Sequence, residues 1–156
     1  MYQHVMIPLD GSELAECVLP HVEAIVTGCS IGRATLVRVV TPLKLIGGVE
    51  SHISPEERHR LEEDSIALAT GYLEEKAQPL RERGVLVECA VLFGSVIDQL
   101  VDYTINHEVD LIIIATHGRS GVSRLFLGSV ADRILRASPV PVLMVHAHGS
   151  EAKVTR

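Results

Sequence analysis

The 156-residue sequence contains few aromatic side chains. It has three tyrosines, two phenylalanines and no tryptophan. Proteins that bind single-stranded nucleic acids stack the bases on aromatic side chains, and this sequence has few residues with which to build such a surface. Basic residues are also the minority, with 14 Lys and Arg against 20 Asp and Glu and a formal net charge of -6. No segment concentrates the basic residues, so we expect no nucleic-acid partner.

Cysteines and long apolar runs are scarce as well. Cys17, Cys29 and Cys89 are an odd number, lie far apart and form no Cys-x-x-Cys pair. This pattern predicts reduced thiols and a cytoplasmic protein. No stretch approaches the roughly 18 apolar residues of a membrane span, and the first ten residues lack the basic and apolar regions of a signal peptide. We therefore expect no membrane association.

The sequence is nevertheless rich in aliphatic residues, since 47% of it is hydrophobic and 22% is charged. These values are typical of globular proteins. A chain of this length can bury a hydrophobic core without disulfides or metals. We expect one domain over residues 1–147, followed by a polar tail over residues 148–156.

Strand-like and helix-like segments alternate along this domain. Short apolar runs predict five strands, at residues 5–9, 36–40, 85–92, 110–116 and 142–145. Helical spacing of apolar residues, with capping residues before it, predicts helices at 12–28, 54–83, 95–105 and 129–137, the first mildly disturbed by Pro20. Residues 43–55 are expected to form an irregular loop. The alternation predicts an α/β fold: an open, Rossmann-like, five-stranded parallel sheet of order 3-2-1-4-5 with helices on both faces.

A glycine-punctuated segment follows the fourth predicted strand. It runs from Ala115-Thr116-His117-Gly118 through nine residues to Gly128-Ser129-Val130, which opens a helix. Glycine lets a phosphate approach the backbone closely. The free N–H groups and the dipole at the start of a helix favour an anion, and the Ser129 hydroxyl adds a donor. This pattern predicts a phosphate-binding loop.

Other side chains of the segment have open roles. Arg119 and Arg124 could neutralise phosphate charge or could be solvated loop arginines. His117 could contact phosphate, act as a base or make a local hydrogen bond. Ligands of open parallel sheets bind beyond the carboxyl ends of the strands. We therefore expect the segment to meet the ends of the first two strands, at Pro8-Leu9-Asp10 and Val39-Val40-Thr41.

Standard nucleotide and hydrolase motifs are missing from the sequence. It contains neither Gly-x-x-x-x-Gly-Lys-Ser/Thr nor Gly-x-Gly-x-x-Gly, so a P-loop NTPase or a Rossmann dehydrogenase is not supported. Gly118-Arg119-Ser120-Gly121 is one residue short of a Gly-x-Ser-x-Gly nucleophile elbow. The histidine pairs His52/His59 and His146/His148 lack the spacing of a structural zinc site. We expect no metal ligated by the protein itself.

Three parts of the sequence together resemble the universal stress protein family. They are Pro8-Leu9-Asp10-Gly11-Ser12, the segment from Ala115 through Gly121 to Leu127-Gly128-Ser129-Val130, and Ser138-Pro139-Val140-Pro141-Val142-Leu143. The family has five-stranded α/β domains. Its ATP-binding members carry Gly-x-x-Gly, nine residues, then Gly-Ser/Thr. The spacing here is the same, but Ala115 replaces the first glycine, and alanine tolerates an extended backbone but not a positive φ.

The resemblance implies roles for individual residues. Asp10 would accept hydrogen bonds from ribose hydroxyls or from the adenine end, although it could also cap the first helix. Pro8 and Val39 would shape the base pocket. The phosphates would be surrounded by Gly118, Gly128, Ser129 and Val130. The full predicted site comprises Pro8, Leu9, Asp10, Val39, Ala115, His117, Gly118, Arg119, Gly121, Gly128, Ser129 and Val130. No catalytic residue is assigned.

Three classes of function follow from the sequence and the resemblance. The favoured one is a stress-response or signalling module that binds ATP, or AMP or ADP, with Mg²⁺ as a further candidate held through the phosphates. The second is a slow ATPase or a phosphoryl or adenylyl transferase, against which the loop offers no evident catalytic carboxylate or lysine. The third is a dimeric stress protein that binds no nucleotide. The resemblance also implies a homodimer through the fifth strand, Pro141 to Val145, because an apolar edge strand favours pairing.

Overall fold

A computed structural model describes residues 2–42, 54–117 and 129–147. Five parallel strands form one sheet of order β3-β2-β1-β4-β5, as the sequence predicts. The elements are, in chain order, β1 (His4–Pro8), α1 (Glu13–Glu16), α2 (Leu19–Gly28), β2 (Arg33–Val40), α3 (Pro55–Glu82), β3 (Val87–Phe93), α4 (Val96–Asn106), β4 (Leu111–His117), α5 (Ser129–Ala137) and β5 (Val142–Ala147).

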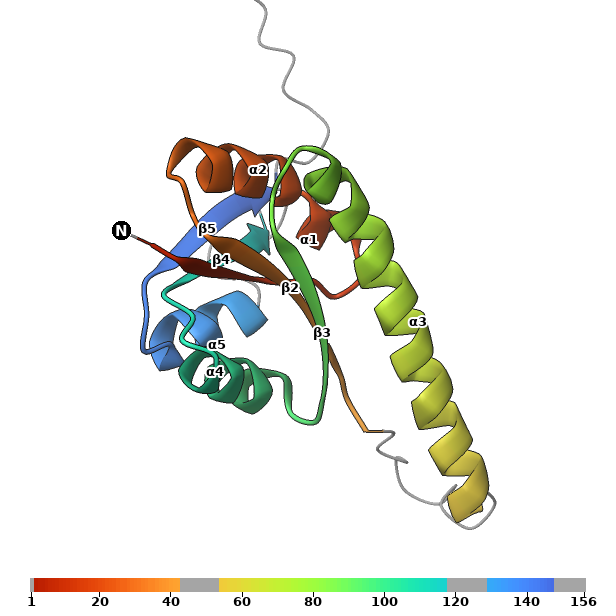
Figure 1. The fold of residues 1–156 in the computed structure, drawn as a ribbon. Helices are drawn as coiled ribbons and strands as arrows, with labels where there is room; N and C mark the ends of the chain where they lie inside the picture. The colour runs from red at the N-terminus through yellow and green to blue at the C-terminus, as the bar shows by residue number, and fades with distance from the viewer. Residues whose placement is uncertain (1, 43–53, 118–128, 148–156) are drawn as a thin grey trace, which may run out of the picture.

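Helices cover both faces of the sheet (Figure 1). Helices α1, α2 and α3 pack on one face, and α4 and α5 pack on the other. Strand β4 contributes to both cores, because Ile113 joins the first and its neighbours Ile112 and Ile114 join the second. Burial on both faces explains why β4 is continuously apolar rather than alternating.

The prediction of a single helix over residues 12–28 was wrong. The chain forms the short α1 and then the separate α2, with Cys17 and Val18 between them. Pro20 has no backbone N–H, and its ring would clash with the carbonyl of residue 16 if the helix continued. At the second position of α2 these problems disappear, because the first N–H groups of a helix have no partner inside it. Pro20 therefore begins a new helix instead of mildly disturbing one.

Helix α3 begins and ends where the sequence predicts. The Ser54 hydroxyl accepts a hydrogen bond from the Glu57 N–H at 3.1 Å. At the other end Gly84, with φ +84°, and Val85 donate their N–H groups to the carbonyls of Arg81 and Leu80. This cap includes Val85, so β3 begins at Val87 rather than at residue 85. The predicted loop at residues 43–55 lies outside the described residues up to residue 53.

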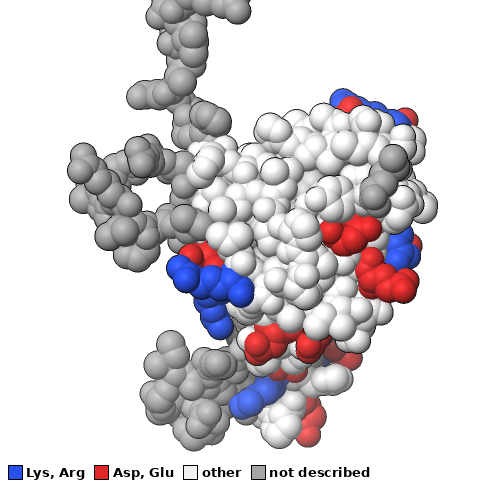
Figure 2. Space-filling view, turned by 90° about the vertical axis from the view of Figure 1, so that its left-hand side faces the viewer, with Lys and Arg blue, Asp and Glu red and all other residues white. Residues whose placement is uncertain are grey.

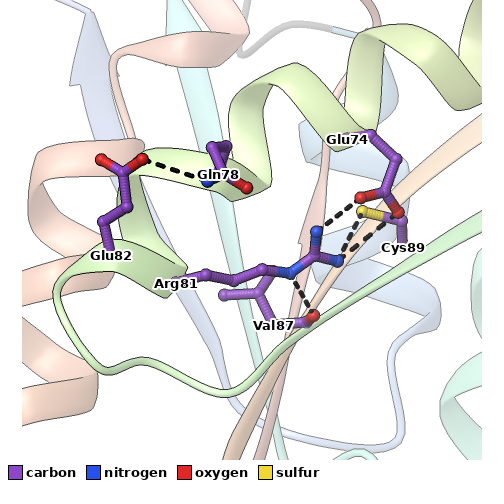
Figure 3. A network of polar contacts seen from close by, with 6 residues as sticks. All are labelled: Glu74, Gln78, Arg81, Glu82, Val87 and Cys89. Carbon is purple, nitrogen blue, oxygen red and sulfur yellow. Dashed lines mark hydrogen bonds and ion pairs between the residues drawn. The ribbon is translucent and has the colours of Figure 1, made fainter.

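A polar network joins the end of α3 to β3 (Figure 3). Arg81 donates its Nε–H to the Val87 carbonyl at 3.0 Å and a terminal N–H to Glu74 at 2.5 Å. The Cys89 thiol lies 3.8 Å from the same guanidinium. Burial raises the pKa of this thiol to about 11, and the neighbouring Glu74 carboxylate adds to the shift. Arg81 thus fastens the helix to the edge strand.

None of the described helices is both long enough and apolar enough to cross a membrane.

Candidate functional site

A cavity of about 260 Å³ opens at the carboxyl end of the sheet. The ends of β1, β2 and β4 and the first turns of α1, α4 and α5 surround it. Seven of the predicted site residues line it: Pro8, Leu9, Asp10, Val39, Ala115, Ser129 and Val130. Residues far apart in the sequence therefore meet at one place, as expected for an open parallel sheet.

The remaining predicted residues are in the loop after β4. His117 ends β4, where its backbone lies opposite Ala147. Gly118, Arg119, Gly121 and Gly128 lie outside the described residues, as does Arg124.

Sequence reasoning missed other residues of the cavity wall. They are Leu14, Ala15, Val37, Val96, Leu100, Ile114 and Ala131. Val37 could have been predicted from the sequence. It lies two residues before Val39, and residues with that spacing share a face of a strand. The α4 residues Val96 and Leu100 carried no such signal, since the packing of α4 against the sheet decides which of its apolar residues reach the cavity.

Asp10 is the one ionisable side chain among the described residues that line the cavity. Its Oδ1 accepts hydrogen bonds from the N–H of Ser12 at 2.9 Å and from the Ser12 hydroxyl at 2.6 Å. Ser12, not Asp10, caps α1, because the Ser12 hydroxyl accepts from the Ala15 N–H at 3.1 Å. Asp10 Oδ2 accepts no hydrogen bond from the described residues and is available to a ligand.

Ala115 lies in regular strand conformation. It pairs with Val145 of β5, and only Ser30 and Glu108 among the described non-glycine residues have positive φ. The backbone therefore needs no glycine here. The alanine that departs from the family motif lines the cavity without backbone strain.

The backbone N–H and C=O groups of Val39 point toward the side of β2 on which β1 lies. The Leu9 N–H donates to the Val37 carbonyl at 2.8 Å, so Val37 directs its backbone groups toward β1. Alternate residues of a strand direct their backbone groups to the same side, so those of Val39 also point that way. Strand β1 ends at Pro8, opposite Val37. Within the described part of the chain, no hydrogen bond occupies the Val39 N–H and C=O on this side.

The first turn of α5 forms the opposite wall. Ser129 begins the helix, and both Ser129 and Val130 are exposed and line the cavity. The first N–H groups of a helix have no partner within it and carry the positive end of the dipole. This wall can receive an anion.

Comparison with known proteins assigns the chain to a family. Residues 1–146 match the family model described as the universal stress protein family. The chain belongs to the universal stress protein family. One member, universal stress protein MJ0577 from Methanocaldococcus jannaschii, is 28% identical over 160 residues, which cover 96% of this chain and 98% of that protein.

Solved structures of the universal stress protein family share the fold. The MJ0577 structure matches with a TM-score of 0.79 at 27% identity, over 96% of this chain and 99% of that one. A family member from Arabidopsis thaliana, solved with AMP bound, matches with a TM-score of 0.64 at 16% identity over 97% of each chain. Another, solved in complex with cAMP, matches with a TM-score of 0.66 at 20% identity over 93% of this chain and 97% of that one.

In this universal stress protein the described walls of the cavity are mainly apolar, and they include the Asp10 carboxylate and the first turn of α5. Over residues 2–42, 54–117 and 129–147, no three His, Cys, Asp or Glu side chains come together in a group that could hold a metal ion. The described residues offer an apolar wall, a hydrogen-bond acceptor on Asp10 and the N–H groups at the start of α5.

Proposed function

We propose that the protein binds an adenine nucleotide, ATP or its products ADP and AMP, in this cavity and acts as a stress-response or signalling module. One observation carries the proposal. A single cavity brings together three features: the backbone groups of Val39 and the Oδ2 of Asp10, which have no hydrogen-bond partner among the described residues, and the first turn of α5. These three features match the base, the ribose and the phosphates. The AMP and cAMP bound to two other members of the family support the same class of ligand.

The base would lie between the apolar walls, with its edge toward Val39. Adenine presents an acceptor, N7, beside a donor, the N6 amino group, whereas guanine presents two acceptors at that edge. One N–H and one C=O from the same residue suit the adenine edge. Pro8 and Leu9 would complete this part of the site. We therefore expect ATP to bind more tightly than GTP.

The ribose and phosphates would follow toward β4 and α5. Asp10 Oδ2 would accept hydrogen bonds from the ribose hydroxyls, and Ser129 and Val130 would offer backbone N–H groups to the phosphates. Ala115, His117, Gly118, Arg119, Gly121 and Gly128 remain predicted contacts. Mg²⁺ would be held by the phosphates and water.

The direct test is the chemical identity of any bound nucleotide. Protein purified without added nucleotide is denatured, and the released compound is identified by chromatography. Release of AMP, ADP or ATP in near-stoichiometric amount supports the proposal. Protein that releases no nucleotide and shows no saturable binding at millimolar ATP, ADP or AMP contradicts it. Incubation with ATP and measurement of ADP separates the alternatives, because sustained turnover would favour the ATPase or transferase.

We also propose a homodimer through β5, in the cytoplasm. Strand β5 lies at one edge of the sheet, so its outer backbone groups have no strand partner within the described chain. Leu143 on this strand is 39% exposed. Figure 2 shows the side that carries α2 and β5, and a broad area of it has no charged residue among those described. Cys17, Cys29 and Cys89 are all free thiols, which suits a reducing compartment.

A further inference from the structure

The turn Asp10-Gly11-Ser12 is exposed, yet it carries the only described carboxylate of the cavity. The helix after it, α1, has only four residues, and so short a helix has little stability of its own. Hydrogen bonds between Asp10 and Ser12 fix the turn internally. Contacts between the turn and the rest of the protein therefore decide where the carboxylate lies.

The side chain of Arg38, on β2, lies directly against Gly11. A Cβ atom built on Gly11 would lie 3.2 Å from both terminal nitrogens of the guanidinium and 3.3 Å from its Cζ. Nearly equal distances to three atoms of a planar group place Gly11 over the face of the guanidinium. Gly11 also has φ +90°. The backbone conformation therefore favours glycine, and a larger residue here would also displace the Arg38 guanidinium by a few tenths of an ångström.

Arg38 is held in turn by Tyr72 of α3. Its Cζ lies 5.1 Å from the centroid of the Tyr72 ring, a distance at which a cation and an aromatic ring attract each other. In the described part of the chain, the Arg38 guanidinium makes no hydrogen bond or ion pair. Its described contacts are therefore the packing on Gly11 and the cation–π contact with the Tyr72 ring.

Tyr72 also holds the far end of α1, which lies beside α3 in Figure 1. Its hydroxyl donates to Glu16 Oε1 at 3.0 Å, and Lys76 pairs with Glu16 Oε2 at 3.1 Å. One tyrosine thus supports the turn through Arg38 and the end of α1 through Glu16. The segment that carries Asp10 is fastened to α3 at both ends.

We propose that Arg38 is a positioning residue that holds the Asp10 turn so that the carboxylate can receive the ribose hydroxyls of the nucleotide. This inference rests on the proposed function. Arg38 is not among the residues that line the cavity. Side chains alternate along a strand, so Arg38 projects to the face opposite Val37 and Val39, which line the cavity.

Arg38→Met tests this role because it keeps the length of the side chain and removes the planar charged group. Two probes are used, ATP and 2′,3′-dideoxy-ATP, which lacks both ribose hydroxyls. We expect ATP to bind about tenfold more weakly, because small displacements of a positioned group are costly, and dideoxy-ATP to bind as before. Tyr72→Leu is expected to act in the same way. Arg33→Met, at the other end of β2, is the matched control and is expected to change neither affinity.

Two results for Arg38→Met would overturn the proposal. One is an equal loss of affinity for both nucleotides, which would indicate a general structural effect. The other is no loss for ATP. Arg38→Lys is expected to recover little, because a lysine lacks the planar group that packs on Gly11 and Tyr72.

Hydrogen exchange tests the same contact without any ligand. We expect the amides of residues 9–16 to exchange faster in Arg38→Met and at the wild-type rate in Arg33→Met. Unchanged exchange in Arg38→Met would overturn the positioning role. If wild-type protein binds no nucleotide, the proposed function fails separately, and the exchange rates alone decide whether Arg38 holds the turn.

Discussion

Asp10 and Ser12 lie two residues apart, and either could have capped the first helix. The structure separates their roles. Ser12 caps α1, and Asp10 uses one carboxylate oxygen to hold Ser12 while the other remains available at the cavity. Capping preferences alone cannot make this distinction, because both side chains are good caps. The two roles differ because the turn lies just beyond the end of β1, where Asp10 lines the cavity and Ser12 precedes α1.

His4 carries a pH dependence that the sequence did not indicate. It is 2% exposed, and it is held between the His107 carbonyl, 2.9 Å from Nδ1, and the Thr35 hydroxyl, 2.8 Å from Nε2. Burial lowers its pKa below the usual value of about 6.5, against the opposing effect of the bond to His107. The neighbouring charges act in both directions, since Arg33 lowers the pKa and Glu88 and Asp110 raise it.

We therefore predict that the free energy of unfolding falls as the pH drops below about 6.5. In this range the unfolded chain binds a proton at His4 that the folded protein binds less readily, so acid favours unfolding. Urea unfolding between pH 7.5 and 5 measures the effect. His4→Gln, which removes the titrating group, should show a shallower slope over this range. Identical slopes for the two proteins would contradict the assignment.

At the scale of elements, the sequence predicted the five strands and most helices, and it failed at junctions. Pro20 was read as a disturbance, but it starts a new helix, because a proline at that place cannot continue α1. The predicted start of β3 was two residues early, because the cap after Gly84 uses Val85. Both errors lie at junctions where the same backbone groups could belong to either of two elements. Local sequence patterns do not show which element they join.

The contact of α3 with β3 contributes to the stability of the fold. Arg81→Met should lower the free energy of unfolding by about 1 kcal/mol, because it removes the bond to the Val87 carbonyl as well as a half-exposed ion pair. Arg83→Met is the matched control. It removes only the exposed pair with Glu23 and should cost about half as much or less. Equal losses in denaturant unfolding would mean that the backbone bond contributes nothing.

At the scale of the whole molecule, the alternation of strands and helices was enough to predict the layers and the sheet. The resemblance to the family was needed to propose an adenine nucleotide as the ligand. Seven predicted residues lie around the cavity, because strand ends can be read from the sequence. The wall from α4 could not be predicted, since it depends on how a helix packs on the sheet. Ala115 needed the structure, because only the strand pairing with Val145 shows that no positive φ is required.

The outer edge of β5 is where the proposed dimer would form. Leu143→Lys places a charge on the edge strand β5 and should shift the protein from dimer to monomer in size-exclusion chromatography with light scattering. Leu86→Lys, just before the opposite edge strand, is the matched control, since Leu86 is 61% exposed and lies away from β5. A wild-type protein that is monomeric at micromolar concentration would contradict the proposal.

The central claim is that the cavity at the ends of β1, β2 and β4 holds an adenine nucleotide. Calorimetric titration with ATP in the presence of Mg²⁺ tests it most directly, in the wild type and in Ala115→Val, whose larger side chain would fill part of the cavity. Ala90→Val, on the far edge strand β3, is the control. We predict saturable binding at one site per chain in the wild type and the control, and loss of binding in Ala115→Val. No binding in the wild type, or unchanged binding in Ala115→Val, would contradict the account.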